Sequence, residues 1–151
     1  DIRRGLDAWI ATGSRTYHSY FLGLYADALQ RLGRHREALR PLDEGLAAAQ
    51  LLPEGLYEAE LYHLRGRSVQ RLSGEAAPQD AADCFDKALR IARAQGSRWF
   101  EWRAATDLAG LLRTRGKAQE AEDLLADATA RFDFVGGWEE PAEELCDAPV
   151  P

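Results

Sequence analysis

The sequence predicts an all-α fold: one leading helix, three helical hairpins and a short C-terminal cap. Three observations lead to this prediction. Three pairs of segments resemble one another along the chain, and their matching positions lie 40 to 43 residues apart. Each segment carries apolar residues at steps of three and four, the spacing of a helix that buries one stripe. A glycine separates the two segments of each pair, where the first helix must end.

The elements follow in order along the chain. A leading helix is expected over residues 2–12, with an apolar face that contains Leu6, Trp9 and Ile10. The expected first helices of the hairpins are "YHSYFLGLYADALQRLG" (17–33), "YEAELYHLRGRSVQRLSG" (57–74) and "FEWRAATDLAGLLRTRG" (100–116). Their expected partners are "LGRHREALRPLDEGLAAAQ" (32–50), "APQDAADCFDKALRIARAQG" (77–96) and "RGKAQEAEDLLADATARF" (115–132). The repeat domain is therefore predicted over residues 1–135, and residues 136–151 are predicted to form a capping turn and a frayed tail.

Small residues recur at fixed positions of these segments. Aligning the repeats superposes three sets: Ala26, Gly66 and Ala109; Ala38, Ala81 and Ala121; Gly45, Ala88 and Ala128. Larger side chains at these positions would push neighbouring helices apart. We therefore expect each of them to face a neighbouring helix.

Composition narrows the function classes. Hydrophobic residues make up 46% and charged residues 29%, which is typical of a globular chain and excludes general disorder. The net charge of −6 argues against nucleic-acid binding. No apolar run approaches the roughly 20 residues that cross a bilayer, so no membrane partner is expected. The two cysteines, Cys84 and Cys146, lie far apart and predict free thiols and a cytoplasmic location.

No pattern of residues points to catalysis or to a cofactor. The sequence has no glycine-rich phosphate loop, no G-x-S-x-G, no H-E-x-x-H and no paired C-x-x-C. Its three histidines are scattered over separate segments, which disfavours a metal site. Carboxylates near helix starts suit the helix dipole, and acid–base catalysis by them is the weaker alternative. We expect a protein that is not an enzyme and uses neither metal nor cofactor.

Residues 17–132 resemble tetratricopeptide repeats (TPR), through the small residues at fixed positions and the glycine between helices. The repeats here are longer than the family's roughly 34 residues, and its usual Trp and closing Pro are missing. More narrowly, "YFLGLYADALQRLGRHREAL" and "YEAELYHLRGR" are similar to the C-terminal repeats of large bacterial signalling ATPases. The resemblance implies a right-handed superhelix that binds protein segments on its concave face. It also implies that the chain is a piece of a longer ATP-dependent regulator.

In this family the first helix of each hairpin lines the concave face. Carried onto this chain, the lining positions are Tyr20, Gly23, Asp27, Gln30 and Arg31 in the first hairpin; Glu60, His63, Arg67, Gln70 and Arg71 in the second; and Arg103, Thr106, Gly110 and Arg113 in the third. Five arginines against two acids predict a basic face, which suits carboxylates and phosphates. The plainer alternative is that these side chains are merely solvated.

These observations predict a module that binds a protein or peptide segment of acidic character. Two alternatives stay open: a spacer or self-association region without a separate ligand, and a small-molecule effector site among the arginines. The aromatic residues that recur at the start of each first helix favour packing between repeats over a ligand cage. The apolar face of the leading helix further predicts a homodimer through the N-terminal end.

Overall fold

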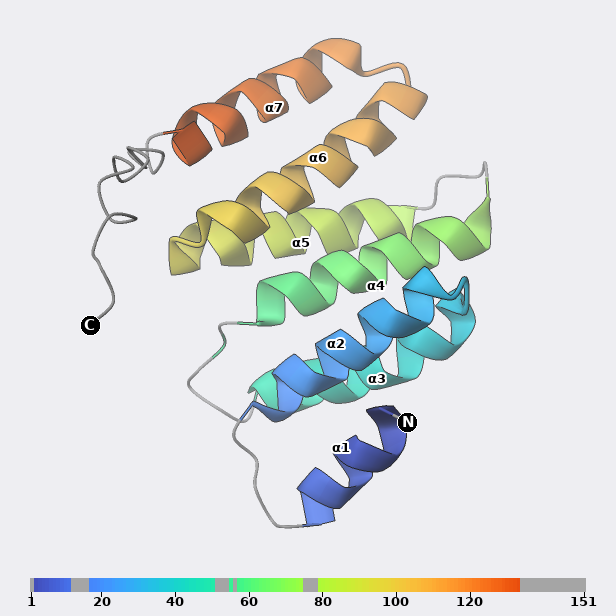
Figure 1. The fold of residues 1–151 in the computed structure, drawn as a ribbon. Helices are drawn as coiled ribbons and strands as arrows, with labels where there is room; N and C mark the ends of the chain where they lie inside the picture. Colours follow the sequence, from blue (N-terminus) through green and yellow to red (C-terminus); the bar gives the residue numbers. More distant parts are fainter. Residues whose placement is uncertain (1, 12–16, 51–54, 56, 75–78, 134–151) are drawn as a thin grey trace, which may run out of the picture.

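A computed structural model describes residues 2–11, 17–50, 55, 57–74 and 79–133 of the chain. All regular structure in these ranges is helical, which confirms the predicted all-α class (Figure 1). The helices are α1 (Ile2–Ala11), α2 (His18–Arg31), α3 (His35–Gln50), α4 (Glu58–Ser73), α5 (Gln79–Gln95), α6 (Arg98–Thr114) and α7 (Ala118–Asp133). The predicted cap and tail over residues 136–151, and the predicted domain boundary at 135, lie outside the described residues. No described helix has the length and apolar content needed to cross a membrane.

Consecutive helices pack against each other from α1 to α7, so the chain forms a one-dimensional array (Figure 1). Contacts also join α2 to α4 and α4 to α6. Within the described ranges no pair of Cα atoms within 8 Å joins α3 to α5 or α5 to α7. The first helices of the hairpins therefore lie closer together than the second helices, and α2, α4 and α6 share one face.

Glycines end the first helices, as predicted. Gly33, Gly74 and Gly116 have φ angles of 75°, 61° and 75°, in the left-handed region where a side chain would be strained. After α2, the Arg34 N–H donates to the carbonyl of Leu29 and the Gly33 N–H to that of Gln30. This pair of bonds is the Schellman motif, which satisfies carbonyls at the end of a helix.

The small residues face neighbouring helices, which confirms their predicted packing role. All nine are buried: Ala26, Ala38, Gly45, Gly66, Ala81, Ala88, Ala109, Ala121 and Ala128. A Cβ at Gly45 would lie 3.2 Å from both methyl carbons of Leu61. A Cβ at Gly66 would lie 2.6 Å from Cε1 of Phe85. The absence of side chains at these glycines is what lets α4 approach both α3 and α5.

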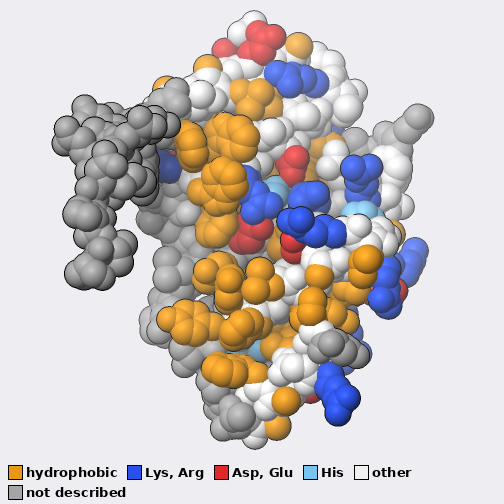
Figure 2. Space-filling view, in the orientation of Figure 1, with side chains coloured by type: hydrophobic (Ala, Val, Ile, Leu, Met, Phe, Trp, Pro, Cys, Tyr) orange, Lys and Arg blue, Asp and Glu red, His pale blue; other side chains and the backbone are white. Residues whose placement is uncertain are grey.

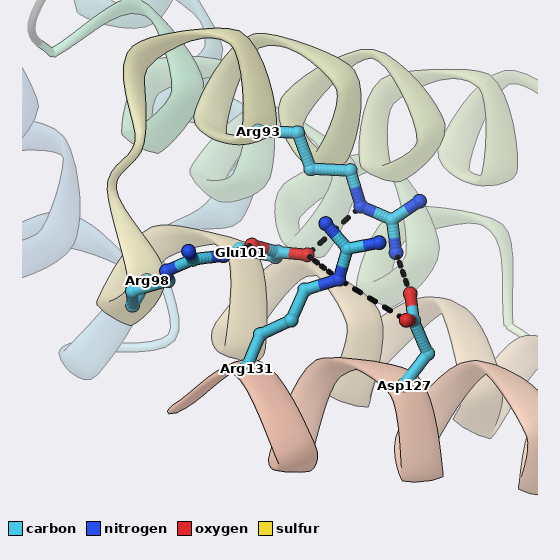
Figure 3. Close-up of polar contacts among 5 residues, drawn as sticks. All are labelled: Arg93, Arg98, Glu101, Asp127 and Arg131. Carbon is cyan, nitrogen blue, oxygen red and sulfur yellow. Dashed lines mark hydrogen bonds and ion pairs between the residues drawn. The ribbon is translucent and has the colours of Figure 1, made fainter. Parts of the chain in front are cut away.

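A buried carboxylate joins the last three helices (Figure 3). Glu101 of α6 is 1% exposed, and its Oε1 lies 2.8 Å from Nε of Arg93 on α5 and 3.6 Å from Nε of Arg131 on α7. Arg98 lies 3.6 Å from the other carboxylate oxygen. Asp127 of α7 binds both Arg93 and Arg131, at 2.6 and 3.1 Å. The surrounding cations compensate the buried charge, which would otherwise be costly.

Candidate functional site

A groove of about 390 Å³ crosses the face shared by α2, α4 and α6. We call it the α2–α4–α6 groove. Its walls include the first turns of all three helices, and α6 contributes Arg103 from its second turn. The lining residues are Ser19, Tyr20, Gly23, Leu24, Asp27, Arg31, Tyr57, Glu60, Leu61, Leu64, Trp99, Phe100 and Arg103.

Aromatic rings form one wall of this groove, and we call Tyr20, Tyr57, Trp99 and Phe100 the aromatic wall. The ring centroids of Tyr20 and Tyr57 are 4.5 Å apart, and those of Tyr57 and Phe100 are 6.2 Å apart. These contacts cross from one hairpin to the next, which confirms the predicted packing between repeats. The same rings also line the groove, and Trp99 is 53% exposed. Figure 2 shows apolar side chains gathered into a band on this face, next to a group of Lys and Arg side chains.

The structure places five of the predicted site residues in the groove lining: Tyr20, Asp27, Arg31, Glu60 and Arg103. Gly23, at another predicted position, lies there too, and a Cβ on it would come within 3.3 Å of Leu61. The remaining predicted residues that keep some exposure lie outside the lining, on the later turns of α4 and α6: Arg67, Gln70, Arg71, Thr106, Gly110 and Arg113. The aromatic wall shows that the predicted positions omitted Tyr57, Trp99 and Phe100. Their recurrence at each helix start was the signal that could have included them.

Two predicted site residues, Gln30 and His63, are buried. Nε2 of Gln30 donates to the carbonyl of Leu64 at 2.6 Å and to Oγ of Ser68 at 2.9 Å. These bonds hold α2 against α4. Gln30 therefore supports the face and has almost no surface with which to contact a ligand.

His63 lies beneath the face in a charged network between α4 and α6. It is 3% exposed; its Nε2 is 2.7 Å from Asp107 and its Nδ1 is 3.5 Å from Glu60. Burial alone would lower the pKa of His63, but the bond to Asp107 and the nearby Glu60 raise it above its usual value. Burial would likewise raise the pKa of Asp107, yet the bond from His63 and the charges of Arg67 and Arg103 lower it. Both shifts favour the ionised pair.

Internal ion pairs reduce the positive charge that the sequence predicts for this face. Nη1 of Arg103 pairs with Glu60 at 2.5 Å, and Nε of Arg31 pairs with Asp27 at 2.7 Å. Asp107 adds a third acid that the predicted positions omitted. The groove beside the aromatic wall is therefore nearly neutral in charge.

The remaining positive charge lies on the later turns of α4 and α6, and we call Arg67, Arg71 and Arg113 the arginine end. None of the three forms an ion pair with a described residue. Their field acts on His35, the first residue of α3: burial lowers the pKa of His35, and the charges of Arg71 and Arg67 lower it further. Cationic side chains that form no direct ion pair are available to an anionic ligand.

A second, smaller hollow of about 330 Å³ lies between α1 and α2. Its lining is apolar: Ile2, Gly5, Leu6, Trp9, Phe21 and Leu24. Trp9 packs edge-on against Phe21, with centroids 5.6 Å apart, and keeps 39% of its surface exposed. The side chain of Ile10, which the prediction placed on this face, lies outside the described part.

Among the described residues, no group of three or more His, Cys, Asp or Glu side chains could hold a metal ion. Cys84 is buried, as expected for a small apolar side chain on the second helix of its hairpin. Comparison with family models, curated proteins and solved structures finds no match to this chain. The fold and the groove therefore define its class: an all-helical array with an aromatic and cationic face.

Proposed function

We propose that this chain is a TPR-like module that binds a protein segment along the face of α2, α4 and α6. One observation carries the proposal: the face that holds the aromatic-walled groove also carries, on the later turns of α4 and α6, three arginines that form no ion pair with a described residue. The ligand that fits is a segment with an aromatic side chain at one end and carboxylates at the other. The pairing of Arg31 and Arg103 with acids restricts the carboxylate subsite to the arginine end.

The binding site has two subsites, the aromatic wall and the arginine end, and the distance between them sets the length of the ligand. From Tyr57 to Arg71 is 14 residues along α4, which at 1.5 Å per residue is about 21 Å. An extended peptide advances about 3.3 Å per residue, so roughly six residues bridge this distance. A segment of about six to eight residues is therefore long enough to contact both subsites at once.

The resemblance to the C-terminal repeats of large bacterial signalling ATPases supports a place for this module in a larger ATP-dependent regulator. In such a protein the groove would act as the interaction or sensing end. The observation that tests this assignment is the complete gene product: a nucleotide-cyclase or ATPase core is expected ahead of the repeats, and a short stand-alone product would contradict it.

Binding is tested with a labelled probe peptide that has one Trp followed by six Glu. Fluorescence anisotropy on the full chain should show binding that weakens as salt rises, because exposed charge contacts are screened over about 10 Å at 0.1 M. A twin peptide with Gln in place of every Glu should bind at least about tenfold more weakly, which corresponds to about 1.4 kcal/mol.

Two variants locate the binding surface. Arg67→Glu with Arg71→Glu should reduce the affinity for the Glu peptide at least about tenfold, since two attractive contacts become repulsive. Arg36→Glu with Arg40→Glu makes the same charge change, at the same spacing, on exposed positions of α3. This control should retain affinity within about threefold. Equal losses in both variants would contradict the proposal and favour the spacer alternative.

A further inference from the structure

The segment that follows α7 has the composition that the groove requires. Residues 134–151 read "FVGGWEEPAEELCDAPVP" and contain Trp138, four glutamates and Asp147, with no Lys or Arg. An aromatic side chain followed by carboxylates is the ligand chemistry inferred above. Opposite charge on the arginine end and on this segment favours their association.

The place where α7 ends brings this segment to the aromatic end of the groove. Phe132, in the last turn of α7, lies with its ring centroid 6.1 Å from that of Trp99 and 6.0 Å from that of Trp102. Trp99 itself lines the groove. The C-terminal end of α7 lies on the same side of the array as the first turns of α4 and α6, on the left in Figure 1. Trp138 is six residues beyond Phe132, so an extended chain lets it reach about 20 Å from that point.

The spacing within the segment matches the spacing of the two subsites. Glu143 and Glu144 follow Trp138 by five and six residues. Extended backbone spans about 17–20 Å over that length, close to the 21 Å or so between the aromatic wall and the arginine end. Pro141 favours extended backbone at the residue before it, which suits this span.

We propose that the groove binds the segment that follows α7 of its own chain, with Trp138 at the aromatic wall and Glu143 and Glu144 at Arg67 and Arg71. The inference rests on the proposed function and names a partner for that site. A short tether gives the segment an effective concentration in the millimolar range, so it competes with any external ligand. The module is then autoinhibited until a tighter ligand displaces the segment.

The test uses the full chain and a labelled peptide of residues 134–148 as the probe. In the segment variant, Trp138→Ala, Glu143→Gln and Glu144→Gln are combined to weaken the internal competitor. The probe should bind this variant at least about tenfold more tightly than it binds the wild type. Adding Arg67→Glu and Arg71→Glu should abolish the gain. A control with Glu120→Gln and Glu122→Gln, exposed on α7, changes the charge by the same two units and should bind the probe as the wild type does.

The remaining outcomes separate this inference from the proposed function. If the probe binds the wild type and the segment variant equally, the groove binds acidic segments but its own segment does not occupy it, and the inference fails alone. If the Glu peptide used to test the proposed function (one Trp followed by six Glu) binds while the peptide of residues 134–148 does not, the inference again fails alone. If neither peptide binds any variant, both fail. If sedimentation shows that the wild type associates and the segment variant does not, the segment acts between two copies, which overturns the intramolecular assignment.

Discussion

Gly66 offers the sharpest test of the packing between α4 and α5. A Cβ at this position would lie 2.6 Å from Cε1 and 2.7 Å from Cδ1 of Phe85, inside any normal contact distance. The ring cannot swing away into solvent because Phe85 is completely buried. Overpacking of this kind costs about 1–3 kcal/mol. Replacing a helical glycine with alanine returns up to about 1 kcal/mol of helix propensity, so Gly66→Ala should lose about 1–2 kcal/mol of stability.

Gly110 is the matched control, since it is also a glycine inside a first helix. A Cβ there meets no atom within 4 Å in the described structure. Gly110→Ala should therefore gain about 0.5–1 kcal/mol from helix propensity alone. Thermal melting followed by circular dichroism should show a fall of about 2–8 °C for Gly66→Ala and a rise of about 1–4 °C for Gly110→Ala. Equal or higher stability of Gly66→Ala relative to the wild type would refute the assigned packing of Gly66 on Phe85.

Three further predictions follow from the buried polar groups and from the N-terminal end. Glu101→Gln should lower the free energy of unfolding in urea by about 2–3 kcal/mol, because three arginines lose their shared carboxylate. The control Glu120→Gln, which breaks an exposed ion pair with Lys117, should lower it by less than about 1 kcal/mol. His63 has a raised pKa in the folded chain, so its ion pair should stabilise the fold fully below its unfolded pKa of about 6.5 and lose that effect as pH rises through the raised value. The difference in unfolding free energy between wild type and His63→Gln should accordingly shrink from pH 6 to pH 9, and a constant difference would contradict the assigned network. At the N-terminal end, sedimentation should show a concentration-dependent dimer that Trp9→Glu disrupts; a clean monomer at high concentration would rule out this apolar surface as an interface.

The helices, their ends and their packing positions could be read from the sequence because each depends on local pattern. Apolar spacing of three and four residues marks the buried stripe of each helix, and the left-handed conformation at Gly33 and Gly116 needs glycine whatever the surroundings. The aligned small residues, such as Ala81 and Gly66, were predicted from the same repeated pattern to face a neighbouring helix, and both are buried. Repetition strengthened these predictions, since one misread segment would not align with the other two.

The electrostatic character of the face was decided by the tertiary structure. Spacing places Arg103, Glu60 and His63 on one side of their helices. It does not determine how deeply each side chain is buried or which partner it contacts. Arg103 and Glu60 are 43 residues apart and pair only because α6 packs beside α4. His63 is buried by Phe85 of α5 and held by Asp107 of α6, contacts that no local pattern encodes.

The sequence by itself determined an all-helical array, the stops between its helices and the small residues at its close contacts. Tertiary structure alone decided that Glu101 is a buried carboxylate held by arginines from three helices. It also decided that, among the described residues of the face shared by α2, α4 and α6, the arginines without an ion pair are those of the arginine end. The physical reason is how far apart along the chain the interacting residues lie. Helix formation and chain reversal depend on residues within a few positions of one another, whereas burial and ion pairing depend on which distant side chains the packing brings within about 4 Å.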